Sequence, residues 1–185
     1  MKILILSKHF WPENFRINDI AKSLSKKNEI YVLSEKPSYH KVQHNSKNLK
    51  NLKSVKFWTY PRSKSKISIL LNYLSFVILG CLNIFRFRKK KFDLVFIYAT
   101  SPIFQTLPGL LYCKIYKIPT FLWVQDLWPD VLEDLKILNY KFILFLTKKL
   151  TNFIYYKSDY IFAQSASFQK NILKIKKKKC LFTIQ

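Results

Sequence analysis

The sequence contains very little glycine, and this scarcity argues against several common kinds of ligand site. Only 2 of the 185 residues are glycine. No Gly-x-Gly-x-x-Gly follows the first apolar run, so a dinucleotide-binding site is disfavoured. A Walker phosphate loop and a Gly-x-Ser-x-Gly nucleophile elbow are also missing. The chemistry of this chain therefore has to be sought in its polar and aromatic side chains.

Cysteine and histidine are also scarce, which argues against a metal centre. The chain has three of each: Cys81, Cys113, Cys180, His9, His40 and His44. The cysteines have no metal-like spacing, and their wide separation fits reduced thiols in a cytoplasmic protein. The histidines have no apparent partners. We expect no metal site and no bound cofactor, and the apolar run at 3–6 is too short for a secretory signal.

Acidic residues are few and unevenly placed. The chain has 33 Lys and Arg against 10 Asp and Glu, a formal net charge of +23, and no acidic residue lies between Glu35 and Asp93. A basic face of this kind attracts anionic lipid, nucleic acid or a diphosphate ligand. The alternative is a solvated surface that reflects a Lys-rich and Asn-rich composition. No recognised nucleic-acid motif accompanies the basic runs, and we expect no nucleic-acid partner.

The apolar pattern predicts an α/β fold, Rossmann-like, with a mainly parallel sheet and helices on both faces. A buried strand at 3–6 precedes a helix whose apolar residues recur at helical spacing (Ile17, Ile20, Ala21, Leu24). Further strands are predicted at 29–34, 55–60, 93–98, 119–124 and 160–163. Further helices are predicted at 67–87, 104–115, 131–138, 142–156 and 164–173. Alternating strands and helices favour one parallel domain over 1–175, with a polar loop at 36–53 and a basic, unstructured tail at 176–185.

The stretch 67–87 is the most apolar part of the chain and has three interpretations. Its length fits a membrane span, but Asn72, Ser75, Asn83 and Arg86 interrupt it near one helical face. Basic residues flank both ends, so there is no positive-inside asymmetry. The segment is a buried domain helix, a domain helix that also touches the bilayer interface, or a true span.

Three loops follow the carboxyl ends of predicted strands, where open parallel sheets bind their ligands. Together they offer His9, Glu13, Asn14, Arg16, Ser101, Asp126, Trp128 and Asp130. Carboxylates accept hydrogen bonds from hydroxyl groups and indoles stack on sugar faces, so the set suits a polyhydroxylated ligand. Asp126 can also act as a base or stabilise positive charge. The structural alternatives are a helix cap at Glu13 or Asn14, an Arg16–Asp19 pair, and packing at Trp128.

Several motifs match one enzyme family in order and spacing. They are Phe-Trp-Pro-Glu-Asn-Phe-Arg-Ile-Asn-Asp-Ile at 10–20, Lys-Pro-Ser-Tyr at 36–39, Asn-Tyr-Leu-Ser-Phe at 72–76, Thr-Ser-Pro at 100–102, Asp-Leu-Trp-Pro-Asp at 126–130 and Gln-Ser-Ala-Ser-Phe at 164–168. With these motifs the chain resembles the start of bacterial family-4 glycosyltransferases, and most of all the WbuB-like branch, which builds O-antigen and capsular polysaccharides. The resemblance covers roughly residues 1–175.

The resemblance implies the N-terminal half of a GT-B enzyme. In that architecture an acceptor-side domain faces a donor domain across a cleft, and transfer is retaining and usually needs no metal ion. The substrates implied are a nucleotide-sugar donor and a polyprenyl-diphosphate-linked saccharide at the inner face of the plasma membrane. Asp126 is then the expected catalytic residue, and the expected substrate contacts are Glu13, Asn14, Arg16, Ser101 and Trp128. The expected contacts with an anionic membrane surface are Lys64, Lys66, Arg88, Lys89, Lys90 and Lys91.

The chain also departs from that family. Asn14-Phe15 stands where many relatives have a Gly-Gly pair, and Gln125 stands where many have histidine. The donor domain is absent, so we expect this chain alone to be inactive. It is then one part of a glycosyltransferase that works with a separate donor-domain chain, or a non-catalytic remnant or membrane-docking subunit. The lysine run at 176–179, where a reading frame can slip, leads to the hypothesis of a frameshifted fragment.

Overall fold

The computed structural model describes residues 1–37, 49–129, 141–175 and 181–183. Within them, seven strands form a single sheet in the order β3-β2-β1-β4-β5-β6-β7, and every neighbouring pair is parallel. The strands are β1 Lys2–Ser7, β2 Glu29–Glu35, β3 Leu52–Phe57, β4 Leu94–Ala99, β5 Thr120–Val124, β6 Tyr160–Ala163 and β7 Leu181–Thr183. The parallel sheet confirms the predicted fold class.

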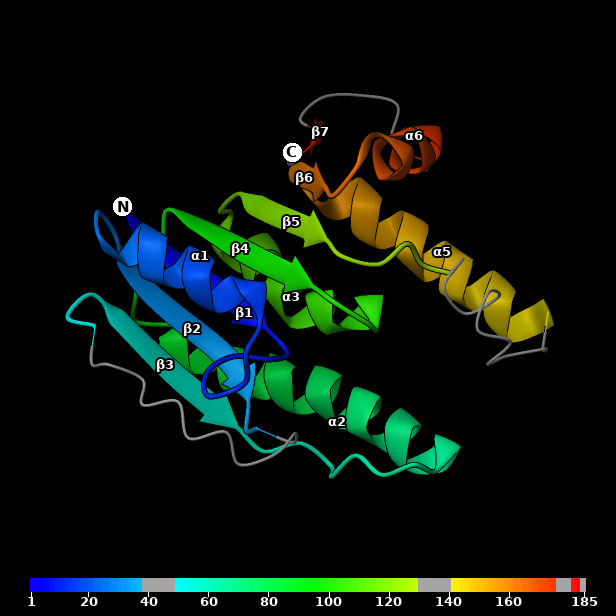
Figure 1. Ribbon diagram of the computed structural model, residues 1–185, viewed down its shortest axis with the longest axis horizontal. Coiled ribbons are helices and arrows are strands. Elements are labelled where there is room, and N and C mark those ends of the chain that lie inside the picture. Colours follow the sequence, from blue (N-terminus) through cyan, green and yellow to red (C-terminus); the bar gives the residue numbers. More distant parts are fainter. Residues whose placement is uncertain (38–48, 130–140, 176–180, 184–185) are drawn as a thin grey trace.

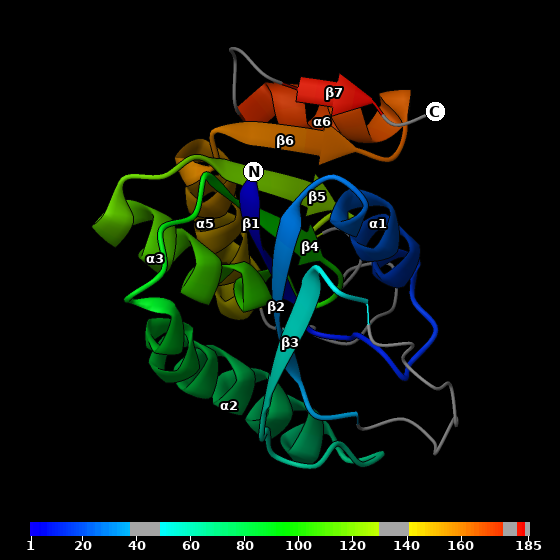
Figure 2. The same ribbon diagram turned by 90° about the vertical axis from the view of Figure 1, so that its left-hand side faces the viewer.

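Helices cover both faces of this sheet, as Figures 1 and 2 show. They are α1 Arg16–Ser25, α2 Lys66–Ile84, α3 Leu107–Tyr116, α5 Lys141–Lys157 and α6 Ala166–Ile175, with short 3₁₀ turns η1 Phe85–Phe87 and η2 Ile103–Thr106. Figure 2 shows α1 on one side of the sheet and α2, α3 and α5 on the other. Because the connections from β4 and β5 run across the sheet in the direction opposite to that from β1, their helices lie on the opposite face.

Two clusters of hydrophobic side chains pack between the sheet and the helices on its two faces. The larger one joins Leu4, Leu6, Val95 and Ile97 of the central strands to the helices α2, α3, α5 and α6. The smaller one joins the other side chains of β1 and β2 to Ile17 and Ala21 of α1. Both faces of the central strands are buried, as expected for a parallel sheet, and this explains why those strands read as continuous apolar runs.

Two predicted segments differ from the structure. The third strand was expected at 55–60 but runs from Leu52 to Phe57, because its pairing with β2 sets its ends. The tail at 176–185 was expected to be unstructured, yet Leu181–Thr183 pairs in parallel with β6. The open edge of β6 offers unpaired backbone groups to such a strand. The predicted helix at 131–138 and most of the loop at 36–53 lie outside the described residues.

The orientation of α2 was not foreseen from its composition. Its inward side carries Ser68, Asn72, Phe76, Gly80 and Ile84, all buried. The polar Asn72 therefore faces the domain, while a row of aliphatic side chains on the other side is exposed to solvent. By length and composition α2 with its 3₁₀ extension is long and apolar enough to cross a bilayer, yet its inner side is packed on the domain.

The close packing of α3 on the sheet predicts a large effect of adding volume at Gly109. A Cβ atom there would lie 2.7 Å from Ile97 Cδ1 and 3.1 Å from Leu6 Cδ2, on two central strands. Gly109→Val should lower the free energy of unfolding by about 2 kcal/mol through overpacking. Urea denaturation followed by circular dichroism measures it, with Lys114→Val at an exposed position of the same helix as the control. Equal stability of the two variants would contradict this packing.

Candidate functional site

The candidate site lies at the edge of the sheet where the strands end. The loops that follow β1, β4 and β5 meet there because parallel strands present their carboxyl ends on one side. Each of these loops contains a cis Xaa–Pro bond, at Trp11–Pro12, Ser101–Pro102 and Trp128–Pro129. The loop after β6 joins them, since the Gln164 amide nitrogen donates a hydrogen bond to Gln125 Oε1.

Ser101, Asp126 and Trp128 form one hydrogen-bonded group, which we call the Asp126 cluster. Ser101 Oγ donates to Asp126 Oδ2 at 2.6 Å, and Trp128 Nε1 donates to Ser101 Oγ at 3.3 Å. The indole is buried and packs edge-on against the ring of Phe104, with centroids 5.2 Å apart. The serine thus fixes one carboxylate oxygen. Oδ1 makes no hydrogen bond within the described part of the chain.

Arg16 begins α1, directly after the loop that follows β1, and so belongs to the same edge of the sheet as this cluster. Burial raises the pKa of Tyr98, at the end of β4, while the charge of Arg16 opposes the rise and that of Asp126 adds to it. Arg16 is exposed at the first residue of α1, and Asn14 beside it is also exposed. The charges of Arg16 and Asp126 therefore both act on Tyr98, and Arg16 itself is exposed to solvent.

Glu13 is buried, although its neighbour Asn14 is exposed. It is only 4% exposed, and its Oε2 lies 2.8 Å from Nδ1 of His9. The His9 ring stacks on Phe15 with centroids 4.5 Å apart. The expectation that His9 lacks a partner is therefore wrong. Neither Glu13 nor Asn14 caps α1 through its side chain, because the N-cap residue is Phe15.

Behind the first loop lies a buried charged group that sequence reasoning missed, which we call the Lys8 cluster. Lys8 Nζ donates to Asn72 Oδ1 at 2.7 Å and lies 4.0 Å from Glu35 Oε1. Glu35 also accepts from Thr59 Oγ1 at 3.0 Å, and its Oε1 lies 3.6 Å from His9 Nδ1. The cluster joins the ends of β1 and β2 to the exit of β3 and to α2. Its partners lie 27 and 64 residues from Lys8, so no local pattern could reveal them, whereas the four-residue spacing of His9 and Glu13 was a usable signal.

Burial controls the ionisation of this cluster. It lowers the pKa of Lys8 to about 8, although the nearby charge of Glu35 partly opposes the shift. It raises the pKa of Glu35, and the charges of Lys8 and His9 oppose that rise. Each charge therefore depends on the other to remain ionised inside the protein. The cluster also contacts the first loop through His9. That loop is further held by Ser7 Oγ, which donates a hydrogen bond to the His9 carbonyl oxygen at 2.6 Å.

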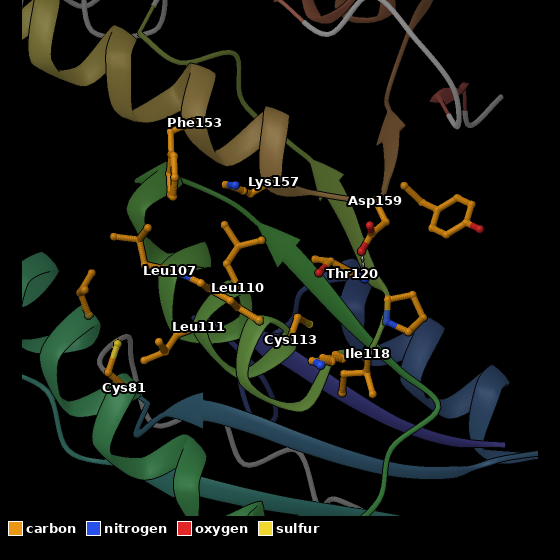
Figure 3. Close-up of a pocket in the computed structure, with 15 residues that line it drawn as sticks. Cys81, Leu107, Leu110, Leu111, Cys113, Ile118, Thr120, Phe153, Lys157 and Asp159 are labelled. Carbon is orange, nitrogen blue, oxygen red and sulfur yellow. Dashed lines mark hydrogen bonds between the residues drawn. The ribbon is translucent and has the colours of Figure 1, made fainter.

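A large cavity lies at the opposite edge of the sheet. It has a volume of about 1160 Å³ and is lined by apolar residues of α2, α3 and α5 together with the starts of β5 and β6 (Figure 3). There the Thr120 amide donates to Asp159 Oδ2 at 2.8 Å. Burial raises the pKa of the Cys113 thiol to about 12 and also raises that of Cys81. Both thiols stay protonated at neutral pH, so they are poor nucleophiles.

The remaining predicted site residues fall into two groups. Lys64 is exposed before α2, and Arg88, Lys89, Lys90 and Lys91 are exposed after η1. Lys66 begins α2, and Asp130 lies outside the described residues. Among those that are described, no group of three or more His, Cys, Asp or Glu side chains is arranged to hold a metal ion.

Comparison with known proteins identifies the fold type. No family model and no curated protein sequence matches the chain. Among solved structures, Arabidopsis thaliana UGT89C1 complexed with UDP-L-rhamnose is similar with a TM-score of 0.60 at 10% identity, over 100% of this chain and 48% of that one. An E. coli trehalose-6-phosphate enzyme bound with UDP-2-fluoro glucose gives 0.56 at 10%, over 95% and 42%. A Siraitia grosvenorii UGT transferase in complex with UDP gives 0.53 at 6%, over 100% and 50%.

These similarities show a Rossmann-like domain of the GT-B type. The chain spans about half the length of each of these structures. At such low identity the likeness establishes the fold and leaves the chemistry to be argued from this chain's own residues.

The ionisation of Lys8 predicts a distinctive dependence of stability on pH. The folded state releases the Lys8 proton near pH 8 and the unfolded state near 10.5, so the unfolded state binds more protons between these values. Stability should therefore gain up to about 3 kcal/mol from this group as pH rises through that window. Lys8→Met should remove this gain.

Urea denaturation at several values between pH 8 and 10.5 measures the effect. Lys22→Met, at an exposed position of α1, is the matched control and should keep the slope of the parent protein. The same slope in Lys8→Met and the parent would contradict the assigned role of the buried ammonium group.

Proposed function

We propose that this chain is the acceptor-binding part of a retaining glycosyltransferase. The observation that carries the proposal is the Asp126 cluster, in which a serine and an indole orient a carboxylate at the ligand-binding edge of a GT-B-type domain. The family resemblance of the Asp-Leu-Trp-Pro motif at 126–129 points to the same residues.

The donor in this proposal is a nucleotide-sugar, because the similar structures contain UDP or UDP-sugars. In the reaction, a hydroxyl oxygen of the acceptor bonds to the anomeric carbon and the nucleoside diphosphate departs with the bonding electrons. The hydroxyl proton passes to the departing diphosphate. Asp126 either accepts the hydrogen bond of that hydroxyl or stabilises positive charge on the sugar ring. Arg16, exposed close to Tyr98, suits the diphosphate of a substrate.

The acceptor in this proposal is a polyprenyl-diphosphate-linked saccharide used to build O-antigen or capsule at the inner face of the plasma membrane. Support comes from the resemblance to the WbuB-like branch and from the net charge of +23, which favours a diphosphate-bearing substrate and an anionic surface. The donor is held mainly by a second domain, supplied by a separate chain or by a longer form of this one. Glu13 acts through His9 and the shape of the first loop, whereas Asn14 and Arg16 reach the ligand directly.

Replacing the carboxylate tests the proposal. With a family-4 donor domain supplied, Asp126→Asn should reduce sugar transfer from a UDP-sugar panel to the lipid-linked acceptor by about a hundredfold or more. The assay follows radiolabelled sugar into the lipid fraction. Ser101→Ala should cost less, about tenfold, because it frees the carboxylate to rotate without removing its charge.

Asp159→Asn is the matched control, because it makes the same chemical change at the opposite edge of the sheet. It should retain the activity of the parent protein, and all three variants should have unchanged circular dichroism spectra. Full transfer by Asp126→Asn would rule out the proposed site.

A further inference from the structure

The side of α2 that faces away from the domain is aliphatic along its whole length. Its exposed residues follow one another at intervals of three or four positions, except where 70 and 71 are adjacent. They are Ile67 (72% exposed), Leu70 (55%), Leu71 (39%), Leu74 (49%), Ile78 (60%) and Leu82 (64%). We call these six residues the α2 stripe. A contiguous exposed row of large aliphatic side chains is unusual on a soluble domain and marks an interaction surface.

The inner side of α2 fixes the stripe in this position. Asn72 is fully buried and bonded to Lys8, so turning the helix over would leave a buried ammonium group without its amide partner. Gly80 lies so close to α3 that a Cβ atom would stand 2.9 Å from Pro108 Cγ. The helix is therefore held to the domain along its length. It cannot cross a bilayer without drawing the sheet in with it.

Positive charge flanks the stripe at both ends. Arg62 and Lys64 precede the helix, and Arg88, Lys89 and Lys91 follow its 3₁₀ extension, all exposed. No acidic residue of the chain lies between Glu35 and Asp93 to offset them. The surface therefore combines an apolar centre with cationic ends, the arrangement of helices that lie within the interface of an anionic bilayer.

We propose that the α2 stripe inserts in the plane of an anionic membrane and anchors the domain there at shallow depth. Exposed Trp58 and Tyr60, on the segment that leads into α2, are of the type that settles at the lipid headgroup level. A second copy of the chain is a poorer occupant. Packing two stripes together would bring the basic ends of two strongly cationic chains close to one another.

The anchor adds a membrane location to the proposed function, and the biological purpose of the anchor rests on that function. The first residues of α2 lie near the carboxyl edge of the sheet (Figure 1), so a domain lying on α2 has its candidate site beside the lipid surface. A diphosphate-linked acceptor would then enter from the membrane without leaving it. The anchoring itself requires neither donor nor acceptor and can be measured without them.

Co-sedimentation of the 185-residue chain with vesicles tests the anchor. The parent chain should bind vesicles of phosphatidylethanolamine with roughly 30% phosphatidylglycerol and should bind phosphatidylcholine vesicles far more weakly. The triple variant Leu70→Gln, Leu74→Gln, Ile78→Gln should bind the anionic vesicles at least about tenfold more weakly. Glutamine is also a good helix former, so the variant should keep the circular dichroism spectrum of the parent.

A second apolar helix supplies the matched control for the stripe. Phe142, Phe145 and Leu146 are comparably exposed on α5, and their triple replacement by glutamine should leave vesicle binding within about twofold of the parent. Loss of binding with the α5 variant but not with the α2 variant would overturn the proposal. A chain that ignores vesicles and forms dimers that the α2 variant abolishes would assign the stripe to a second copy instead.

Two further variants test the contribution of the basic residues to vesicle binding. Replacing Arg88, Lys89 and Lys91 with glutamine should weaken binding to anionic vesicles about tenfold or more. The same change at Lys22, Lys26 and Lys27, beside α1 on the opposite face, alters the net charge equally and should have a much smaller effect. Equal losses would show a general attraction of the cationic chain to the vesicles and would contradict a defined docking face.

Discussion

The buried ammonium group of Lys8 is the constraint on which much of the rest of the structure depends. A charged group in the interior is tolerated only with close partners, and its partners come from two distant segments. Glu35 ends β2, while Asn72 and Tyr73, whose ring centre lies 4.6 Å from the ammonium nitrogen, belong to α2. To supply Asn72, α2 must turn the side that carries this residue inward. The aliphatic side of α2 is left facing solvent, so the internal Lys8–Asn72 hydrogen bond helps to create an external apolar surface.

The sequence predicts the elements that depend on local patterns, but not those that depend on contacts between distant residues. The central strands are short continuous apolar runs such as 3–6 and 94–97, and their length and their polar flanks predict buried strands. The third strand was misplaced because its ends depend on pairing with β2. The strand at 181–183 was missed because three residues carry no period. The orientation of α2 could not be foreseen, since the deciding contact joins residues 64 positions apart.

The candidate site could be predicted in part. The rule that parallel sheets bind ligands at their carboxyl edge selected the loops that hold Ser101, Asp126 and Trp128, and the structure brings these three together. The rule could not say which side chains point outward. Glu13 is held inside by His9, whereas its neighbour Asn14 and the nearby Arg16 remain accessible.

The central claim is that saccharide ligands bind at the carboxyl edge and not in the cavity at the amino edge. Chemical-shift mapping of the isotopically labelled chain with a short-chain polyprenyl-diphosphate-linked saccharide tests it most directly. The account predicts shifts of the Trp128 indole N–H and of the backbone amides of Ser101 and Asp126. Shifts confined to Thr120, Lys157 and Asp159, which line that cavity, would contradict it.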